Sequence, residues 1–134
     1  MNIPLTARVR ILKFFLILTG ILLFFWWPVS HWFYSDAYHF LLGFEPGTFP
    51  GGMVKIIGTC GVFPVLLAIF SSKDPVHSKY MILTMIASLI LLGLTFLHLI
   101  HSGEFPNREY VNAGLCLAGA GFLIFIFPWQ ASGR

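Results

Sequence analysis

Histidines are the side chains of this sequence best suited to chemistry, and four of the five are candidate ligands for one metal ion. His98 and His101 are three residues apart near the end of an apolar run, so they share a face if the run is helical. His31 and His39 lie in the segment that follows the first apolar run. Imidazole is a common ligand of zinc, copper and iron, and a nearby carboxylate could complete the set. The spacing matches no established ligand motif, and interfacial polar residues without a ligand are the alternative.

A second kind of site would hold an organic cofactor or a lipid. Trp32 belongs to an aromatic segment that could form one wall of an apolar slot. His98 or Lys55 could then bond a carbonyl oxygen of a quinone or a lipid headgroup. The alternative is that this aromatic segment anchors in the headgroup layer and binds nothing specific.

A haem or another pigment is the least favoured cofactor. Haem between two histidines needs ligands from two helices at similar depth, and no other apolar run besides that of His98 contains a histidine. The second ligand would have to come from the segment that holds His31 and His39. The sequence also has no nucleophile elbow, phosphate-binding loop or zinc-protease motif, so we expect no bound cofactor and no enzymatic activity of the chain alone.

The amino-acid composition indicates that these residues belong to a protein that lies in lipid. The chain of 134 residues is 57% hydrophobic and 10% charged, with a mean hydropathy of +0.85. Soluble domains contain about 25% charged residues, so this chain cannot cover a globule with a polar surface. An ordinary soluble enzyme is excluded, and so is a nucleic-acid-binding domain, despite a pI near 9.1.

Four apolar runs predict an all-α fold in which four transmembrane helices form a bundle. They cover about residues 11–27, 54–70, 80–100 and 110–129, and each has nearly the 20 residues that a membrane-spanning helix needs. The chain is then a single membrane domain over residues 1–134. Residues 28–53, between the first two spans, predict a short interfacial helix and an irregular loop that together cap one end of the bundle.

Charge patterning predicts the orientation of the spans. Both termini and the turn before the third span carry six basic residues and one acidic residue, whereas the opposite side carries two basic and four acidic residues. Because basic loops stay in the cytoplasm, we expect both termini to lie there. The expected location is the cytoplasmic (inner) membrane of a bacterium.

Small residues predict where the helices approach one another closely. Gly58 and Gly61 lie in the second span, and Gly114, Ala118 and Gly121 lie in the fourth. Without bulky side chains at these positions, helix backbones can come close enough for van der Waals contact in lipid. We therefore expect both sets to lie at packing interfaces.

The stretch 52–82 resembles the small DoxX/BphX-like membrane proteins. It has a glycine-bearing second span, a basic residue, an Asp-Pro pair and a histidine, here Lys73, Asp74, Pro75 and His77. The resemblance implies four spans with a long first loop, and some DoxX relatives are implicated in quinone-linked redox metabolism. It implies no catalytic residues, because the family offers no agreed active-site motif.

The leading functional prediction is a non-catalytic accessory or assembly subunit of a larger bacterial membrane complex. Its partners would be the lipid bilayer and other membrane subunits, and no nucleic acid. One alternative is a DoxX-like redox subunit with a quinone or metal site formed by His98, His101, His31 and Lys55. The other is a small transporter or a lipid-binding protein.

Overall fold

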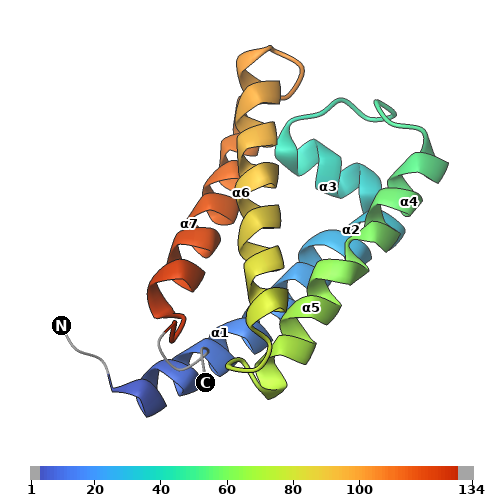
Figure 1. The fold of residues 1–134 in the computed structure, drawn as a ribbon. Helices are drawn as coiled ribbons and strands as arrows, with labels where there is room; N and C mark the ends of the chain where they lie inside the picture. Colours follow the sequence, from blue (N-terminus) through green and yellow to red (C-terminus); the bar gives the residue numbers. More distant parts are fainter. Residues whose placement is uncertain (1–3, 130–134) are drawn as a thin grey trace.

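The computed structural model describes residues 4–129, and all regular structure in that range is helical (Figure 1). The elements, in chain order, are α1 (Leu5–Phe24), a π-helical turn η1 (Phe25–Val29), α2 (Ser30–Phe33), α3 (Ser35–Leu42), α4 (Gly51–Cys60), α5 (Val62–Lys73), α6 (Lys79–His101), a 3-10 turn η2 (Asn107–Glu109) and α7 (Tyr110–Ile126).

Four helical segments are long and apolar enough to cross a membrane, which confirms the predicted number of candidate spans. They are Leu5–Phe33, Gly51–Lys73, Lys79–His101 and Asn107–Ile126. The first is longer than expected and includes residues assigned to the cap, because the chain accommodates Pro28 in a π-helical turn and continues as a helix. The last begins before Tyr110 and ends at Ile126, since Phe127 is extended and a proline follows.

The segments form two helix pairs. Figure 1 shows that α1 packs along α5 and α6 packs along α7. The two pairs meet near the turn between α5 and α6 and diverge toward their other end, where α3 and the loop before α4 lie between them. We call this open end the α3 end. The predicted short helix in the cap is thus α3, which stops at Gly43 with a φ of +94°, a conformation that favours glycine.

The apolar core lies at the end where the two helix pairs meet. All four long segments supply fully buried side chains there, and the cluster consists of Leu12, Leu16, Ala68, Ile82, Met85, Ile86, Ala120, Leu123, Ile126 and Phe127. Residues three, four or seven apart place these side chains on one face of each helix. The α3 end contains buried polar side chains and a series of contacting aromatic rings.

Close helix contacts occur at some of the predicted small residues. A Cβ on Gly58 would lie 2.7 Å from the Cβ of His31, and a Cβ on Gly61 would lie 2.7 Å from Cγ of Trp27. Both glycines therefore let the end of the first span lie directly on α4. Gly93 plays the same part between α6 and α7, since its Cβ would lie 2.8 Å from Cγ of Leu117.

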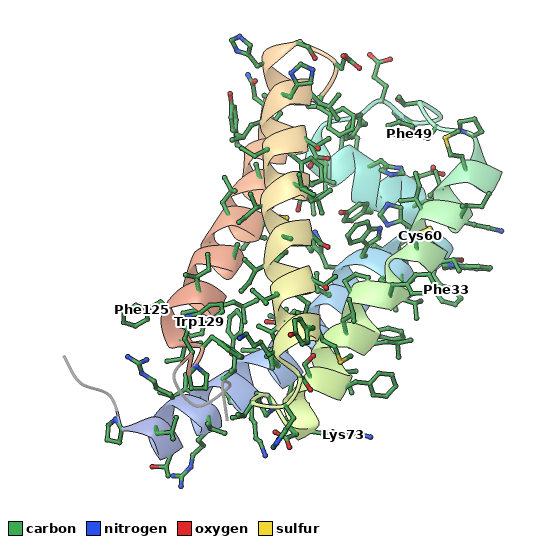
Figure 2. The ribbon with its side chains drawn as sticks, in the orientation of Figure 1. Phe33, Phe49, Cys60, Lys73, Phe125 and Trp129 are labelled. Atoms are coloured by element: carbon green, nitrogen blue, oxygen red, sulfur yellow. The ribbon has the colours of Figure 1, made fainter. Side chains whose placement is uncertain are left out.

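The predicted small residues of the last span face outward instead. Gly114, Ala118 and Gly121 are all exposed. A Cβ on Gly114 or Gly121 would meet no atom within 4 Å among residues 4–129. Within residues 4–129 these two glycines have no packing partner on the outward face of α7, because α7 is rotated so that Ala113 and Ala120 point inward. Figure 2 shows Phe125 projecting from the same outward face of α7.

Candidate functional site

The four predicted metal-binding histidines are not brought together. His31 and His39 lie beside each other at the α3 end, with ring centroids 5.4 Å apart. His98 and His101 are exposed side chains of the last turns of α6. Within residues 4–129 no group of three or more histidine, cysteine or acidic side chains could hold a metal ion. The physical reason is the rotation of α6, which leaves His98 and His101 exposed, whereas His31 is buried where α2 contacts α3 and α4.

Lys55 and Trp32, predicted to bind a quinone or headgroup together with His98, do lie side by side. The Nζ of Lys55 is 5.7 Å from the centroid of the Trp32 ring. The Trp32 Nε1 donates a hydrogen bond of 3.2 Å to Oγ1 of Thr59, whose hydroxyl donates to the Lys55 carbonyl. These contacts tie α2 to α4. His98 belongs to α6 and takes no part, so the three residues do not form one site.

A buried polar chain that the sequence did not indicate crosses the α3 end. Nε1 of Trp26 donates to Oδ1 of Asn112 at 3.0 Å, and Nδ2 of Asn112 donates to Oε2 of Glu109 at 2.6 Å. Glu109 is 3% exposed and Asn112 is 7% exposed. The chain joins η1 to the beginning of α7, two segments that lie 86 residues apart in sequence. It is the most deeply buried set of polar side chains at this end of the described structure.

Tyr38 of α3 covers this chain. Its ring meets the Trp26 ring edge-to-face, with centroids 5.5 Å apart. Burial raises the pKa of the Tyr38 hydroxyl, and the negative charge of Glu109 raises it further, whereas a hydrogen bond with Asn112 acts in the opposite direction. The neutral phenol is therefore the form that this environment favours.

Two histidine rings extend the cluster from Tyr38. The His31 ring lies 4.9 Å from the Tyr38 ring, and its Nδ1 is 2.9 Å from the Trp27 carbonyl. Because a carbonyl only accepts, Nδ1 carries the proton, and Nε2 of a neutral His31 is left as an acceptor. Burial lowers the pKa of His39, and His31 lowers it further, against the opposing effect of Asp36.

The π-helical turn positions these side chains. Pro28 has no N–H, so an α-helical hydrogen bond is missing there, and the chain widens into a five-residue π turn. Side chains satisfy carbonyls of the turn, since Oγ of Ser30 donates to Phe25 O at 2.7 Å and His31 bonds Trp27 O. The wider turn directs Trp26 toward α7 and His31 toward α3. Such turns are frequent at functional sites.

A groove of about 370 Å³ adjoins the cluster between α3 and the end of the first span. Its walls include the aromatic rings of Phe25, Trp26, Tyr34 and Tyr38. The same Trp26 and Tyr38 side chains contact the buried chain to Asn112 and Glu109, so the buried acid lies behind the groove wall. The arrangement brings an aromatic surface and a carboxyl group close together.

Sequence reasoning missed Trp26, Glu109 and Asn112 as one cluster. The available signal was an acid and an amide three residues apart at the start of the last apolar run, a spacing that puts both on one helix face. Trp26 gave no such signal, because an aromatic residue at the end of a span normally marks the membrane interface.

Comparison with protein-family models, curated proteins and solved structures found no match to this chain. The resemblance to DoxX/BphX-like proteins therefore has no support from these comparisons.

Proposed function

We propose that the protein is a non-catalytic, multi-pass membrane protein that serves as an accessory or assembly subunit of a larger membrane complex. The outward face of α7 is the observation that supports this proposal. Gly114, Ala118 and Gly121 leave a shallow strip on that face, and no atom of residues 4–129 fills the space above Gly114 or Gly121.

Association between helices in lipid depends on close packing, because lipid tails are as apolar as leucine. Small residues allow the backbone of a second helix to approach, and large neighbours provide contact area. The strip on α7 is bordered by Leu115 and Phe125, which are 60% and 63% exposed. This combination suits a partner helix better than it suits lipid chains alone.

The polar chain at the α3 end supports the same function by fixing α7. Trp26 and Glu109 both bond Asn112, which holds the first turn of α7 against η1. Because hydrogen bonds are directional, this restricts rotation of α7 about its axis. The outward strip is then presented in one orientation, as a subunit interface requires.

Charge supports the proposed location in the cytoplasmic membrane of a bacterium, with both termini in the cytoplasm. Arg8, Arg10 and Lys13 lie in the first turns of α1, Lys73 ends α5 and Lys79 begins α6. Figure 1 shows that these helix ends lie at the same end of the molecule, opposite the α3 end. Basic residues at one end indicate the cytoplasmic side.

The test is native mass after extraction from the natural membrane in a mild detergent. We expect the 15.1 kDa chain to migrate within a much larger assembly, and Gly114→Leu or Gly121→Leu to release it. Gly93→Leu is the contrasting variant, because Gly93 is packed inside the chain, where leucine would overlap Leu117 and destabilise the fold itself.

A wild-type chain that migrates alone or as a small homo-oligomer would refute the accessory-subunit proposal. The α7 interface would be refuted if the assembly kept its mass with leucine at both Gly114 and Gly121. Circular dichroism of each variant checks that the helices are intact, so that a loss of association is not a loss of folding.

A further inference from the structure

The groove at the α3 end has the chemistry of a binding site for a positively charged, largely apolar molecule. We propose that it binds an organic cation, an ammonium or phosphonium carrying apolar substituents, over the rings of Trp26 and Tyr38 with Glu109 balancing its charge. This site is separate from the α7 strip, and neither proposal depends on the other.

The first reason to expect a cation is the aromatic character of the groove walls. Phe25, Trp26, Tyr34 and Tyr38 all line the groove. The indole N–H of Trp26 already donates to Asn112, so the π system is what Trp26 offers to a ligand. Aromatic faces attract cations through their quadrupole, and the attraction grows when water is excluded.

The second reason is the Glu109 carboxyl group, which has no cationic partner among residues 4–129. The carboxyl group is 3% exposed, and among residues 4–129 its identified side-chain partner is the neutral Asn112. No ion pair joins Glu109 to the neighbouring Arg108 in the described residues; Nη1 of Arg108 instead donates to the carbonyl of Leu41, at the margin of the groove, at 3.4 Å. A buried carboxylate needs either a proton or a nearby cation, because leaving it charged and alone is costly.

The groove favours an organic cation over an inorganic one. Its walls are mainly apolar and supply few oxygen ligands, whereas hard metal ions require several. The groove is open to its surroundings and has a volume of about 370 Å³, at the lower end of the range for small-molecule sites. At the margin of the groove, Leu22, Phe25 and Leu41 are 59%, 61% and 59% exposed, which gives an apolar molecule dissolved in lipid a direct approach.

Binding and protonation should compete at this site. A cation in the groove stabilises the carboxylate form of Glu109, so lowering the pH should weaken binding. His31 and His39 from α2 and α3 also face the cluster, and their protonation would repel a cation as well. Asp36 lies on the exposed side of α3 and Tyr38 supplies a neutral phenol. Comparison of wild type with Glu109→Gln separates the contribution of the Glu109 carboxylate to the pH dependence from the contribution of the histidines.

The experiment is equilibrium dialysis of the purified full chain in a neutral maltoside detergent. Tetraphenylphosphonium is the cationic probe, since it carries a charge at every pH, and triphenylphosphine oxide is the uncharged probe. We expect one saturable site for the cation, with an affinity that falls at least tenfold in Glu109→Gln. Affinity for the uncharged probe should change less than threefold.

Matched variants distinguish the contributions of charge and ring. Glu104→Gln removes an exposed carboxylate of the neighbouring loop and should leave cation binding within threefold of wild type. Tyr38→Phe keeps the ring and should also stay within threefold, whereas Tyr38→Leu should lower the affinity about tenfold. Gel filtration and circular dichroism establish that each variant is folded. Should Tyr38→Leu fail to fold, the pair of Tyr38→Phe and Glu109→Gln still decides the proposal.

Two results would overturn the proposal. Absence of saturable cation binding by the wild-type protein would show that the groove is no such site. Equal cation affinities of wild type and Glu109→Gln, with an unchanged pH dependence, would show that the groove is an apolar slot for lipid chains. A smaller pH dependence in Glu109→Gln than in wild type, with the histidine contribution retained, would support the assignment of the charge to Glu109.

Discussion

Asn112 should contribute strongly to stability, because it is the central residue of the buried polar chain. Leucine has the same number of side-chain heavy atoms and the same branching as asparagine, so Asn112→Leu removes the bonds to Trp26 and Glu109 without opening a cavity. The bond to Trp26 is 3.0 Å long and the bond to Glu109 is 2.6 Å long. After the substitution, the indole N–H of Trp26 and the carboxyl group of Glu109 both stay buried without this partner.

The expected loss of unfolding free energy follows from these two groups. Hydrogen bonds between membrane helices contribute about 0.6 kcal/mol on average, with a maximum of about 1.7 kcal/mol. Leaving a buried donor or acceptor unpaired costs about 1–3 kcal/mol for each group. Because the two estimates overlap and the added apolar contacts of leucine offset part of the loss, we expect Asn112→Leu to destabilise the protein by about 2–3 kcal/mol.

The assay is reversible unfolding in mixed micelles of a neutral detergent and dodecyl sulfate, followed by far-UV ellipticity. A double-mutant cycle with Trp26→Phe isolates the bond between residues 26 and 112. Its coupling energy should be about 1 kcal/mol, a typical value for hydrogen-bonded neighbours. Thr95→Val is the control, since the exposed Thr95 hydroxyl donates to the carbonyl of Leu91 on its own helix. The control should change stability by about 0.5 kcal/mol or less.

The reasoning would be refuted if Asn112→Leu were as stable as wild type while Thr95→Val behaved as expected. A stable variant would mean that the buried chain contributes nothing to the attachment of α7. A large loss with no coupling to Trp26 would assign the whole effect to Glu109.

Three further predictions concern other contacts. Gly58→Leu should destabilise the fold by more than about 2 kcal/mol in the same unfolding assay, because the leucine side chain would overlap His31. Gly52→Ala is the control and should change the stability little, because the space around Gly52 is open. Burial lowers the pKa of His39, so the unfolded chain binds more protons than the folded chain near and below about pH 6.5. The protection of α3 amides against hydrogen exchange, corrected for the intrinsic base-catalysed rate, should therefore decrease as the pH falls from 8 to 5.5. His39→Phe should remove this decrease. Hydrogen bonds from His77 lower the pKa of Asp74, so they order the turn between α5 and α6 above about pH 4, and this order is lost as the pH falls further. Asp74→Asn should therefore quicken hydrogen exchange in that turn at pH 7. Global stability should change little, because the pair is exposed.

The sequence alone determined the number of long apolar helices. The reason is that membrane-spanning capacity depends on the composition of about 20 consecutive residues, and neighbours elsewhere in the chain do not change it. The short helix predicted within residues 28–53 also depends on local features, because a glycine such as Gly43, with a φ of +94°, can end a helix without requiring contacts from distant residues. The charge difference between the two ends of the helices is likewise a property of the sequence.

The direction in which each side chain points could be determined only from the tertiary structure. Gly58 and Gly114 look alike in sequence, yet one lies against His31 and the other is exposed, because the rotation of each helix depends on all its contacts. His98 shares a helix face with His101 as predicted, but that face of α6 is exposed, whereas His31 is buried. The contact between Trp26 and Asn112 joins residues 86 positions apart, and no local pattern encodes such a separation.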